Sequence, residues 1–152
     1  MQSRIALIGM PGCGKSTVGR HVGRHLGLPV VDCDHEIELR EGCSIRDYFA
    51  SFGETSFRDL EADVVEDITR RGPGIIATGG GSVLRESNRR VLRERCAVMY
   101  LRSTPEELAR RLRHDVKRPL LQGADPLRRL RELFHERDPL YRDVADMVID
   151  GS

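Results

Sequence analysis

The stretch that decides the fold is "IALIGMPGCGKSTVGR", residues 5–20, in which an apolar run is followed by turn residues and then by a lysine. Within it, Gly9–Ser16 fits the pattern G-x-x-x-x-G-K-S/T. This pattern marks a phosphate-binding loop when a strand precedes it and a helix follows it, and both are expected here. We therefore predict a phosphate loop at residues 9–17.

The residue types of this loop suit a polyphosphate ligand. Its glycines allow successive N–H groups to point at phosphate oxygens, and the following helix adds the positive end of its dipole. Lys15 would reach the terminal phosphates, and the Ser16 hydroxyl would bind magnesium. The residues expected to contact the nucleotide are Gly12, Cys13, Gly14, Lys15, Ser16 and Thr17.

Short apolar runs alternate with segments of helical periodicity along the rest of the chain, which is typical of a parallel sheet covered by helices. The expected strands are Ile5–Gly9, Pro29–Asp32, Gly74–Thr78, Ala97–Leu101 and Met147–Asp150. Ligands of such folds bind at the carboxyl ends of the strands. The sequence predicts a single three-layer α/β/α domain over residues 1–152.

Apolar spacing and capping residues locate the helices. The members of two apolar stripes are Val18, Val22 and Leu26, and Phe57, Leu60, Val64 and Ile68. The first stripe predicts a helix that ends at Gly27, and the second a helix over Glu54–Arg71. Thr104 and Asp125, each followed by proline, are expected to cap two further helices.

Magnesium needs a carboxylate besides Ser16, but the strand expected at residues 74–78 leads into glycines. The nearest acidic residues are Asp32 and Asp34, which close the preceding strand. Two residues apart on an extended segment, their side chains would point to the same side. Asp32 could then hold the metal through water while Asp34 faces the phosphate acceptor. Alternatively, either aspartate only caps a helix that begins near His35.

Composition narrows the class of protein. The chain has 152 residues, with 25 Lys and Arg against 24 Asp and Glu, and this balance argues against nucleic-acid binding. Its apolar runs are too short to span a membrane, and it shows neither a secretion signal nor a coiled coil, so we expect a cytoplasmic monomer without a membrane partner. The cysteines match no redox pair or zinc site and are expected to be reduced, namely Cys13, Cys33, Cys43 and Cys96.

Segments spread over nearly the whole chain resemble the motifs of the shikimate kinase family. "GMPGCGKST" is similar to its phosphate loop, and "VDCDHEIE" to its acceptor aspartate segment. "FGETSFR" resembles its Gly-Glu-x-x-Phe-Arg element, and "TGGG" its glycine triplet. "RPLL" is similar to the start of its lid arginine motif, and "ERDPLYRDVA" to its second acceptor arginine segment.

The resemblance implies transfer of the γ-phosphoryl group of ATP to the 3-hydroxyl of shikimate, with Mg²⁺, in aromatic amino-acid biosynthesis. It also implies a five-stranded parallel sheet in the order 2-3-1-4-5, like that of the nucleoside monophosphate kinases. On this pattern the acceptor-binding region covers about residues 33–61, and the lid about residues 112–124.

The residues matched to the acceptor site suit shikimate, a ring with one carboxylate and three hydroxyl groups. Arginine forks bind a carboxylate with two hydrogen bonds, although Arg58 could instead form only a surface ion pair. By the family's pattern, Asp34 accepts from ring hydroxyls, either as a general base or as a positioning group, and phosphoryl transfer favours positioning. The expected substrate-binding residues are Asp34, Arg58, Gly79, Gly80, Gly81 and Arg137.

The segment "ARRLRHDVKRPLL", residues 109–121, is rich in cations, most of which would lie on a solvated face. Arg118 matches the family's lid arginine, which would close over the phosphates and exclude water. The resemblance thus assigns catalytic roles to Lys15, Asp34 and Arg118. Arg111, alone or with Arg110, matches the position that lies against adenine.

Family members usually continue past the last strand with an adenine-binding loop and a final helix, whereas this sequence ends at Ser152. A truncated version and a shorter natural form are both open, and we expect the core chemistry to survive while nucleotide affinity and stability are in question. Two other functions also remain open. They are a different P-loop kinase, such as a gluconate kinase, and a non-catalytic module, against which the presence of Lys15, Asp34 and Arg58 argues.

Overall fold

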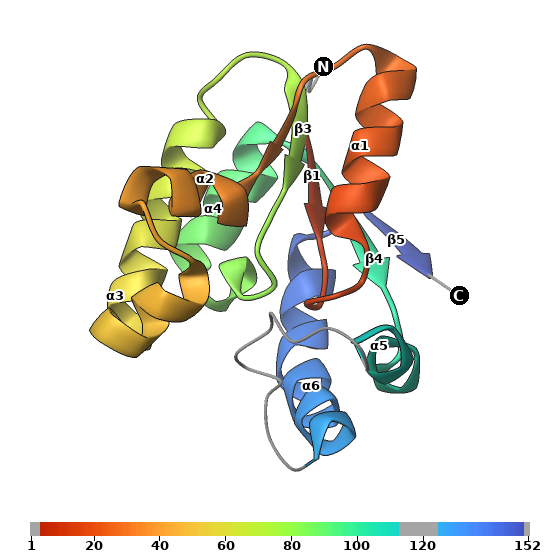
Figure 1. The fold of residues 1–152 in the computed structure, drawn as a ribbon. Coiled ribbons are helices and arrows are strands. Elements are labelled where there is room, and N and C mark those ends of the chain that lie inside the picture. Colours follow the sequence, from red (N-terminus) through yellow and green to blue (C-terminus); the bar gives the residue numbers. More distant parts are fainter. Residues whose placement is uncertain (1–3, 113–124, 151–152) are drawn as a thin grey trace.

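Five parallel strands form one sheet in the part of the chain that the structure, a computed structural model, describes, residues 4–112 and 125–150 (Figure 1). The strand order is β2-β3-β1-β4-β5. The predicted fold class and strand order are thereby confirmed. In chain order the elements are β1 (Arg4–Ile8), α1 (Lys15–Leu26), β2 (Val30–Asp32), α2 (Cys33–Glu41), α3 (Ile45–Ile68), β3 (Gly74–Ala77), the 3₁₀ helix η1 (Ser82–Leu84), α4 (Glu86–Arg95), β4 (Ala97–Arg102), α5 (Pro105–Leu112), α6 (Pro126–Val144) and β5 (Met147–Asp150).

The strands lie where the sequence predicts them, with ends shifted by at most one residue. The expected caps are also present. Thr104 Oγ1 accepts from the N–H of Glu107 at 3.2 Å, and Asp125 Oδ1 accepts from the N–H of Arg128 at 3.0 Å. Local capping chemistry therefore sets the starts of α5 and α6.

The two faces of the sheet are covered differently. Because side chains alternate along a strand, Leu7 and Ile75 point to the face that carries α1. Their neighbours Ala6, Ile8 and Ile76 belong to the main core on the opposite face. That core is completed by residues of α3, α4 and α6, among them Val64, Ile68, Leu92, Leu133 and Tyr141.

The buried face of α1 is formed by glycines rather than by its apolar stripe. Val18 and Val22 are only partly buried and Leu26 is 54% exposed, whereas Gly19 and Gly23 are buried. A Cβ on Gly23 would lie 2.4 Å from Val30 Cγ2, so only glycine allows the helix to approach the sheet this closely. The periodicity of valines therefore located the helix but not the face that packs.

Helix α3 contains a break that the sequence analysis did not predict. Gly53 has φ 81° and ψ 175°, which separates an N-terminal part from the part that begins at Glu54. The second part matches the predicted helix but ends at Ile68 rather than Arg71. Its buried side chains include Arg58 and Glu61 besides the apolar stripe.

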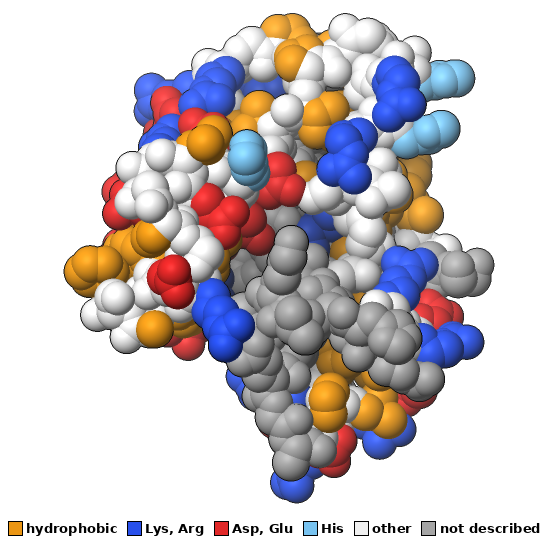
Figure 2. Space-filling model, viewed as in Figure 1, with side chains coloured by type: hydrophobic (Ala, Val, Ile, Leu, Met, Phe, Trp, Pro, Cys, Tyr) orange, Lys and Arg blue, Asp and Glu red, His pale blue; other side chains and the backbone are white. Residues whose placement is uncertain are grey.

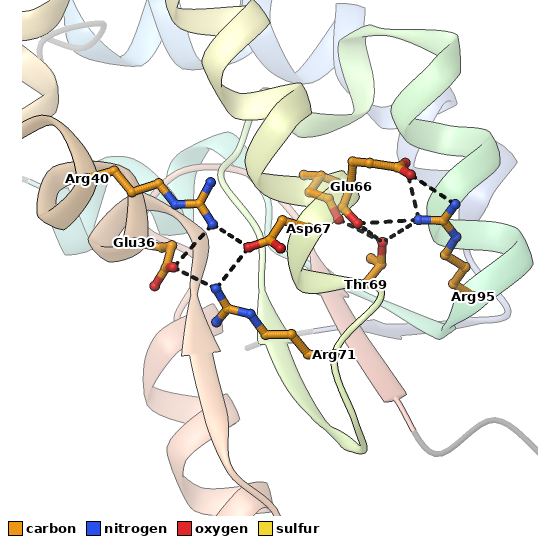
Figure 3. A network of polar contacts seen from close by, with 8 residues as sticks. Glu36, Arg40, Glu66, Asp67, Thr69, Arg71 and Arg95 are labelled. Carbon is orange, nitrogen blue, oxygen red and sulfur yellow. Dashed lines mark hydrogen bonds and ion pairs between the residues drawn. The ribbon is translucent and has the colours of Figure 1, made fainter.

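Ion pairs on the surface fasten α2 to the end of α3 (Figure 3). Arg71 contacts Glu36 at 2.8 Å and Asp67 at 3.0 Å, and Arg40 contacts the same two carboxylates. The hydrogen bond from Arg71 lowers the pKa of the Glu36 carboxyl. The network holds the helix that carries Asp34 against the helix that carries Arg58.

The cysteines are free thiols, and the described helices do not meet the requirements of a membrane span. No disulfide joins the cysteines, and Cys13, Cys33 and Cys96 are buried. Within residues 4–112 and 125–150, no helix has the length and apolar character needed to cross a bilayer.

Candidate active site

The phosphate loop joins β1 to α1, as predicted. Gly14 precedes the helix with φ 95°, a left-handed conformation that glycine adopts readily. A Cβ on Gly9 would lie 2.6 Å from the carbonyl oxygen of Leu101, so the loop is pressed against the end of β4. The close contact with Leu101 and the conformation of Gly14 therefore define the path of the loop backbone.

Lys15 is nearly buried and is held by the loop itself. Its Nζ donates to the carbonyl oxygens of Gly9 at 2.7 Å and Met10 at 2.9 Å, and lies 3.7 Å from Cys13 Sγ. The ammonium group is therefore already anchored at the loop, where a P-loop lysine contacts terminal phosphates.

Ser16 and Asp32 lie together beside the loop. The Ser16 hydroxyl donates to Asp32 Oδ2, while Asp32 Oδ1 accepts from the N–H groups of Asp34 at 3.0 Å and His35 at 3.2 Å. Asp32 is therefore a helix cap as well as a partner of Ser16. Among the described residues, no group of three or more His, Cys, Asp or Glu could hold a metal. A hydroxyl next to one carboxylate fits a magnesium ion that takes its other ligands from water and phosphates.

The predicted backbone conformation of Asp34 is wrong. Asp34 lies in the first turn of α2 and not on an extended segment, because Asp32 ends the strand and caps the helix at once. Its carboxylate nevertheless lies at the glycine triplet. A Cβ on Gly79 would lie 2.8 Å from both Asp34 Oδ1 and Glu61 Oε2.

Arg58 is only 7% exposed, which excludes the alternative that it forms a surface ion pair. Its Nη1 contacts Glu61 Oε1 at 2.9 Å and its Nε contacts Glu54 Oε2 at 3.3 Å. Burial raises the pKa of the Glu61 carboxyl, the charge of Arg58 opposes that rise, and the charge of Asp34 adds to it. The pair thus occupies the interior of the site.

Arg137 enters the same region from α6. It is 3% exposed, and its Nε and Nη1 have no hydrogen-bond partner among the described residues. Glu61 Oε2 is likewise buried without a partner there. Since unpaired buried charges are costly, such groups point to a ligand that would complete them.

The glycine triplet Gly79–Gly81 lies between these charges and the phosphate loop. A Cβ on Gly81 would lie 2.3 Å from Arg58 Nη1, and one on Gly80 would lie 2.7 Å from Pro11 Cδ. The triplet therefore brings the acceptor residues and the phosphate loop into contact, and side chains there would force them apart.

Arg111, rather than Arg110, faces the loop. Both arginines are exposed, but it is Arg111 whose Nη1 donates to the carbonyl oxygen of Cys13 at 3.0 Å. Arg118 and the lid residues 113–124 lie outside the described residues. The adenine and lid assignments therefore stay predictions.

Sequence reasoning missed Tyr141, whose hydroxyl donates to the carbonyl oxygen of Gly80 at 2.5 Å. The signal was the helical spacing of α6, where the buried residues are Leu130, Leu133, Arg137, Tyr141 and Val144. An arginine on an otherwise apolar stripe indicates a functional role. The same spacing places Tyr141 one turn after Arg137.

Acidic side chains gather on the surface over the region of α2, left of centre in Figure 2. This helix contributes Asp34, Glu36, Glu38 and Glu41. Such a surface attracts a divalent cation and repels free anions, so an anionic ligand gains its attraction from the buried arginines. The sheet order, the loop with its lysine and the buried cations define an ATP-dependent small-molecule kinase of the P-loop class.

Comparisons with known proteins confirm the predicted family. The family model described as shikimate kinase matches residues 11–152. The chain belongs to the shikimate kinase family.

Individual relatives agree with this assignment. A shikimate kinase of Paracidovorax citrulli is 57% identical over 97% of this chain and 82% of its own length. One of Ralstonia nicotianae is 51% identical over 97% of this chain and 78% of its own length. The solved structure of a shikimate kinase from Acinetobacter baumannii in complex with shikimate has a TM-score of 0.96 and 42% identity, covering 98% of this chain and 83% of that one.

Proposed function

We propose that the chain transfers the γ-phosphoryl group of ATP to the 3-hydroxyl of shikimate, giving shikimate 3-phosphate and ADP. The observation that carries the proposal is the pair of buried arginines, Arg58 and Arg137, at a glycine triplet that touches the phosphate loop. The Acinetobacter relative, similar over 98% of this chain, was solved with shikimate.

In this proposal the shikimate carboxylate binds between the two guanidinium groups. The free Nε and Nη1 atoms of Arg137 can donate to it, and Arg58 is oriented by its bond to Glu61. Asp34 accepts from the ring hydroxyls, and the amides of Gly79, Gly80 and Gly81 line the opposite side. These contacts fix the 3-hydroxyl toward the phosphate loop.

Phosphoryl transfer needs alignment and charge neutralisation more than covalent catalysis. The amides of Gly12, Cys13 and Gly14, with Ser16 and Thr17, bind the phosphates, and Lys15 exchanges its loop carbonyls for the γ-phosphate. Arg111 and Arg118 complete the ATP site. Asp34 either removes the hydroxyl proton or only orients it.

Magnesium would be held by Ser16 directly and by Asp32 through water. When bound, it neutralises charge on the β- and γ-phosphates. We further propose a cytoplasmic monomer with shikimate and ATP as its ligands and without nucleic-acid or membrane partners, as the composition supports.

The test is ADP release from ATP and magnesium with shikimate, with gluconate or without an acceptor. Release that depends on shikimate supports the proposal. Release with gluconate alone would favour the other kinase, and shikimate binding without turnover would favour a non-catalytic module.

The role of Asp34 needs a separate variant. Asp34→Asn keeps the shape of the side chain and removes its charge. A rate near that of the wild type would show positioning, while a large loss of kcat at unchanged shikimate affinity would show an essential base.

A further inference from the structure

We propose that Tyr141 is a positioning residue that fixes the peptide between Gly80 and Gly81 and thereby aligns the acceptor site with the phosphate loop. The inference rests on the proposed function, because it concerns the same site. Its starting observation is the bond of 2.5 Å from the Tyr141 hydroxyl to the carbonyl oxygen of Gly80.

The hydroxyl is a dependable donor in this place. Tyr141 is fully buried, and burial raises the pKa of its hydroxyl, with the charge of Arg137 opposing the rise. Its ring packs on Tyr100, with ring centroids 4.8 Å apart. The side chain therefore remains protonated and has little freedom to turn away from Gly80.

Fixing one carbonyl fixes a donor on the other side of the peptide. The carbonyl of Gly80 and the N–H of Gly81 belong to one planar trans unit and point in opposite directions. The N–H of Gly81 therefore points away from Tyr141. Without the bond, two glycines in succession would leave this peptide free to rotate.

The fixed peptide lies where a rotation would disturb both substrates. A Cβ on Gly80 would lie within 3.0 Å of the Pro11 nitrogen, and one on Gly81 would lie 2.5 Å from the Arg58 Cζ. Because Arg137 precedes Tyr141 by one helical turn, α6 supplies both a cation for the acceptor and the tyrosine that orients the triplet. Tyr141 thus acts through the glycines rather than on the substrate.

The test compares two phenylalanine variants. Tyr141→Phe keeps the ring and removes the hydroxyl that binds Gly80. The matched control, Tyr100→Phe, removes the neighbouring hydroxyl, which donates to Asp138 Oδ1 at 2.6 Å instead. Both lose one hydrogen bond from the same aromatic pair, so a purely structural role predicts the same effect for both.

We expect kcat/KM for shikimate to fall about tenfold in Tyr141→Phe, with the KM for ATP within about twofold of the wild type. Tyr100→Phe should leave both parameters near the wild type. Equal changes in the two variants would overturn the proposal, as would a Tyr141→Phe enzyme with unchanged shikimate kinetics.

A second measurement keeps this test separate from the proposed function. If the wild type releases no ADP with shikimate, the proposed function fails, and the amide NMR signals of Gly80 and Gly81 decide the role of Tyr141. Tyr141→Phe should broaden or split these signals, whereas Tyr100→Phe should not. Single, unshifted signals in Tyr141→Phe would overturn the proposal.

Discussion

In the phosphate loop, Lys15 donates to two carbonyl oxygens of the loop, whereas on the acceptor side Arg137 and Glu61 each bury polar atoms without a partner among the described residues. The loop is shaped by glycine backbone and satisfies its own cation. The acceptor side is built from charges on three helices that leave hydrogen-bonding capacity for a ligand. An unsatisfied buried charge costs stability, so the acceptor side bears a cost that shikimate would relieve.

The largest effect on turnover is expected at Lys15. Replacing this side chain tests whether the shape of the phosphate loop alone is enough for phosphoryl transfer. Lys15→Ala should lower kcat by about 10²–10³-fold, because the γ-phosphate loses its buried cation. Shikimate-dependent ADP release measures this. Arg20→Ala removes an exposed cation from the same helix and serves as the control. Turnover near the wild type in Lys15→Ala would show that the phosphates bind elsewhere.

Arg58 and Arg137 are expected to differ in how they affect stability, because Arg58 has an ion-pair partner and two nitrogen atoms of Arg137 have none among the described residues. Arg58→Ala leaves the buried Glu61 carboxylate without its ion-pair partner. We expect it to weaken shikimate binding by about 2–5 kcal/mol and also to lower the unfolding free energy. Arg137→Met should also lose shikimate affinity but keep or raise the unfolding free energy, since it removes a buried cation that lacks two partners. Calorimetric binding and urea unfolding measure the two quantities. Equal destabilisation by both variants would contradict this difference, and an effect of Arg58→Ala on ATP instead of shikimate would refute its acceptor role.

A methyl group at Gly80 would separate the two regions directly. Gly80→Ala places a Cβ 2.7 Å from Pro11 Cδ, so the triplet or the loop must move, and we expect kcat/KM to fall about tenfold for both substrates. Gly72→Ala, where nothing lies within 4 Å of the added Cβ, is the matched control. Loss for only one substrate would mean that the two regions are aligned independently.

The smallest expected effect is on the pH dependence of the unfolding free energy, through Glu61. Because burial raises the pKa of Glu61 above its usual value of 4.5, the folded state holds this proton more tightly than the unfolded chain does. The contribution of Glu61 to stability is therefore full below its unfolded pKa and is lost as pH rises through its folded pKa.

Glu61→Gln removes this loss, so its unfolding free energy should improve relative to the wild type as pH rises from about 4. Urea unfolding of both proteins at several pH values measures this difference, in which titrating groups that do not interact with Glu61 cancel. A constant difference across pH would show that Glu61 does not titrate in this range.

The phosphate loop and the acceptor side also differ in how much of each could be predicted from the sequence. The phosphate loop is a local feature, because strand, glycines, lysine and helix follow one another, and its boundaries and caps were predictable. The acceptor side combines residues from α2, α3 and α6 with the triplet after β3. Its members were identified by resemblance, but their burial and missing partners depend on tertiary packing.

The errors have specific physical causes. Asp34 was placed on an extended segment because the helix was expected to begin near His35, whereas the cap formed by Asp32 starts it at Cys33. On α1, the apolar stripe located the helix, whereas its close packing against the sheet depends on Gly19 and Gly23. Tyr141 was overlooked because its role depends on a contact with Gly80, sixty-one positions away in the chain.

The break at Gly53 divides α3 into two helical parts, which we expect to open separately. Hydrogen bonding along a helix is transmitted turn by turn, so an interruption allows one part to open while the other stays closed. Amide hydrogen exchange should therefore be faster in residues 45–52, where Ser51 and Phe52 are exposed, than in the turns that carry Arg58 and Glu61. Residues 45–52 can thus fluctuate while Arg58 and Glu61, which would hold the ligand, keep their positions.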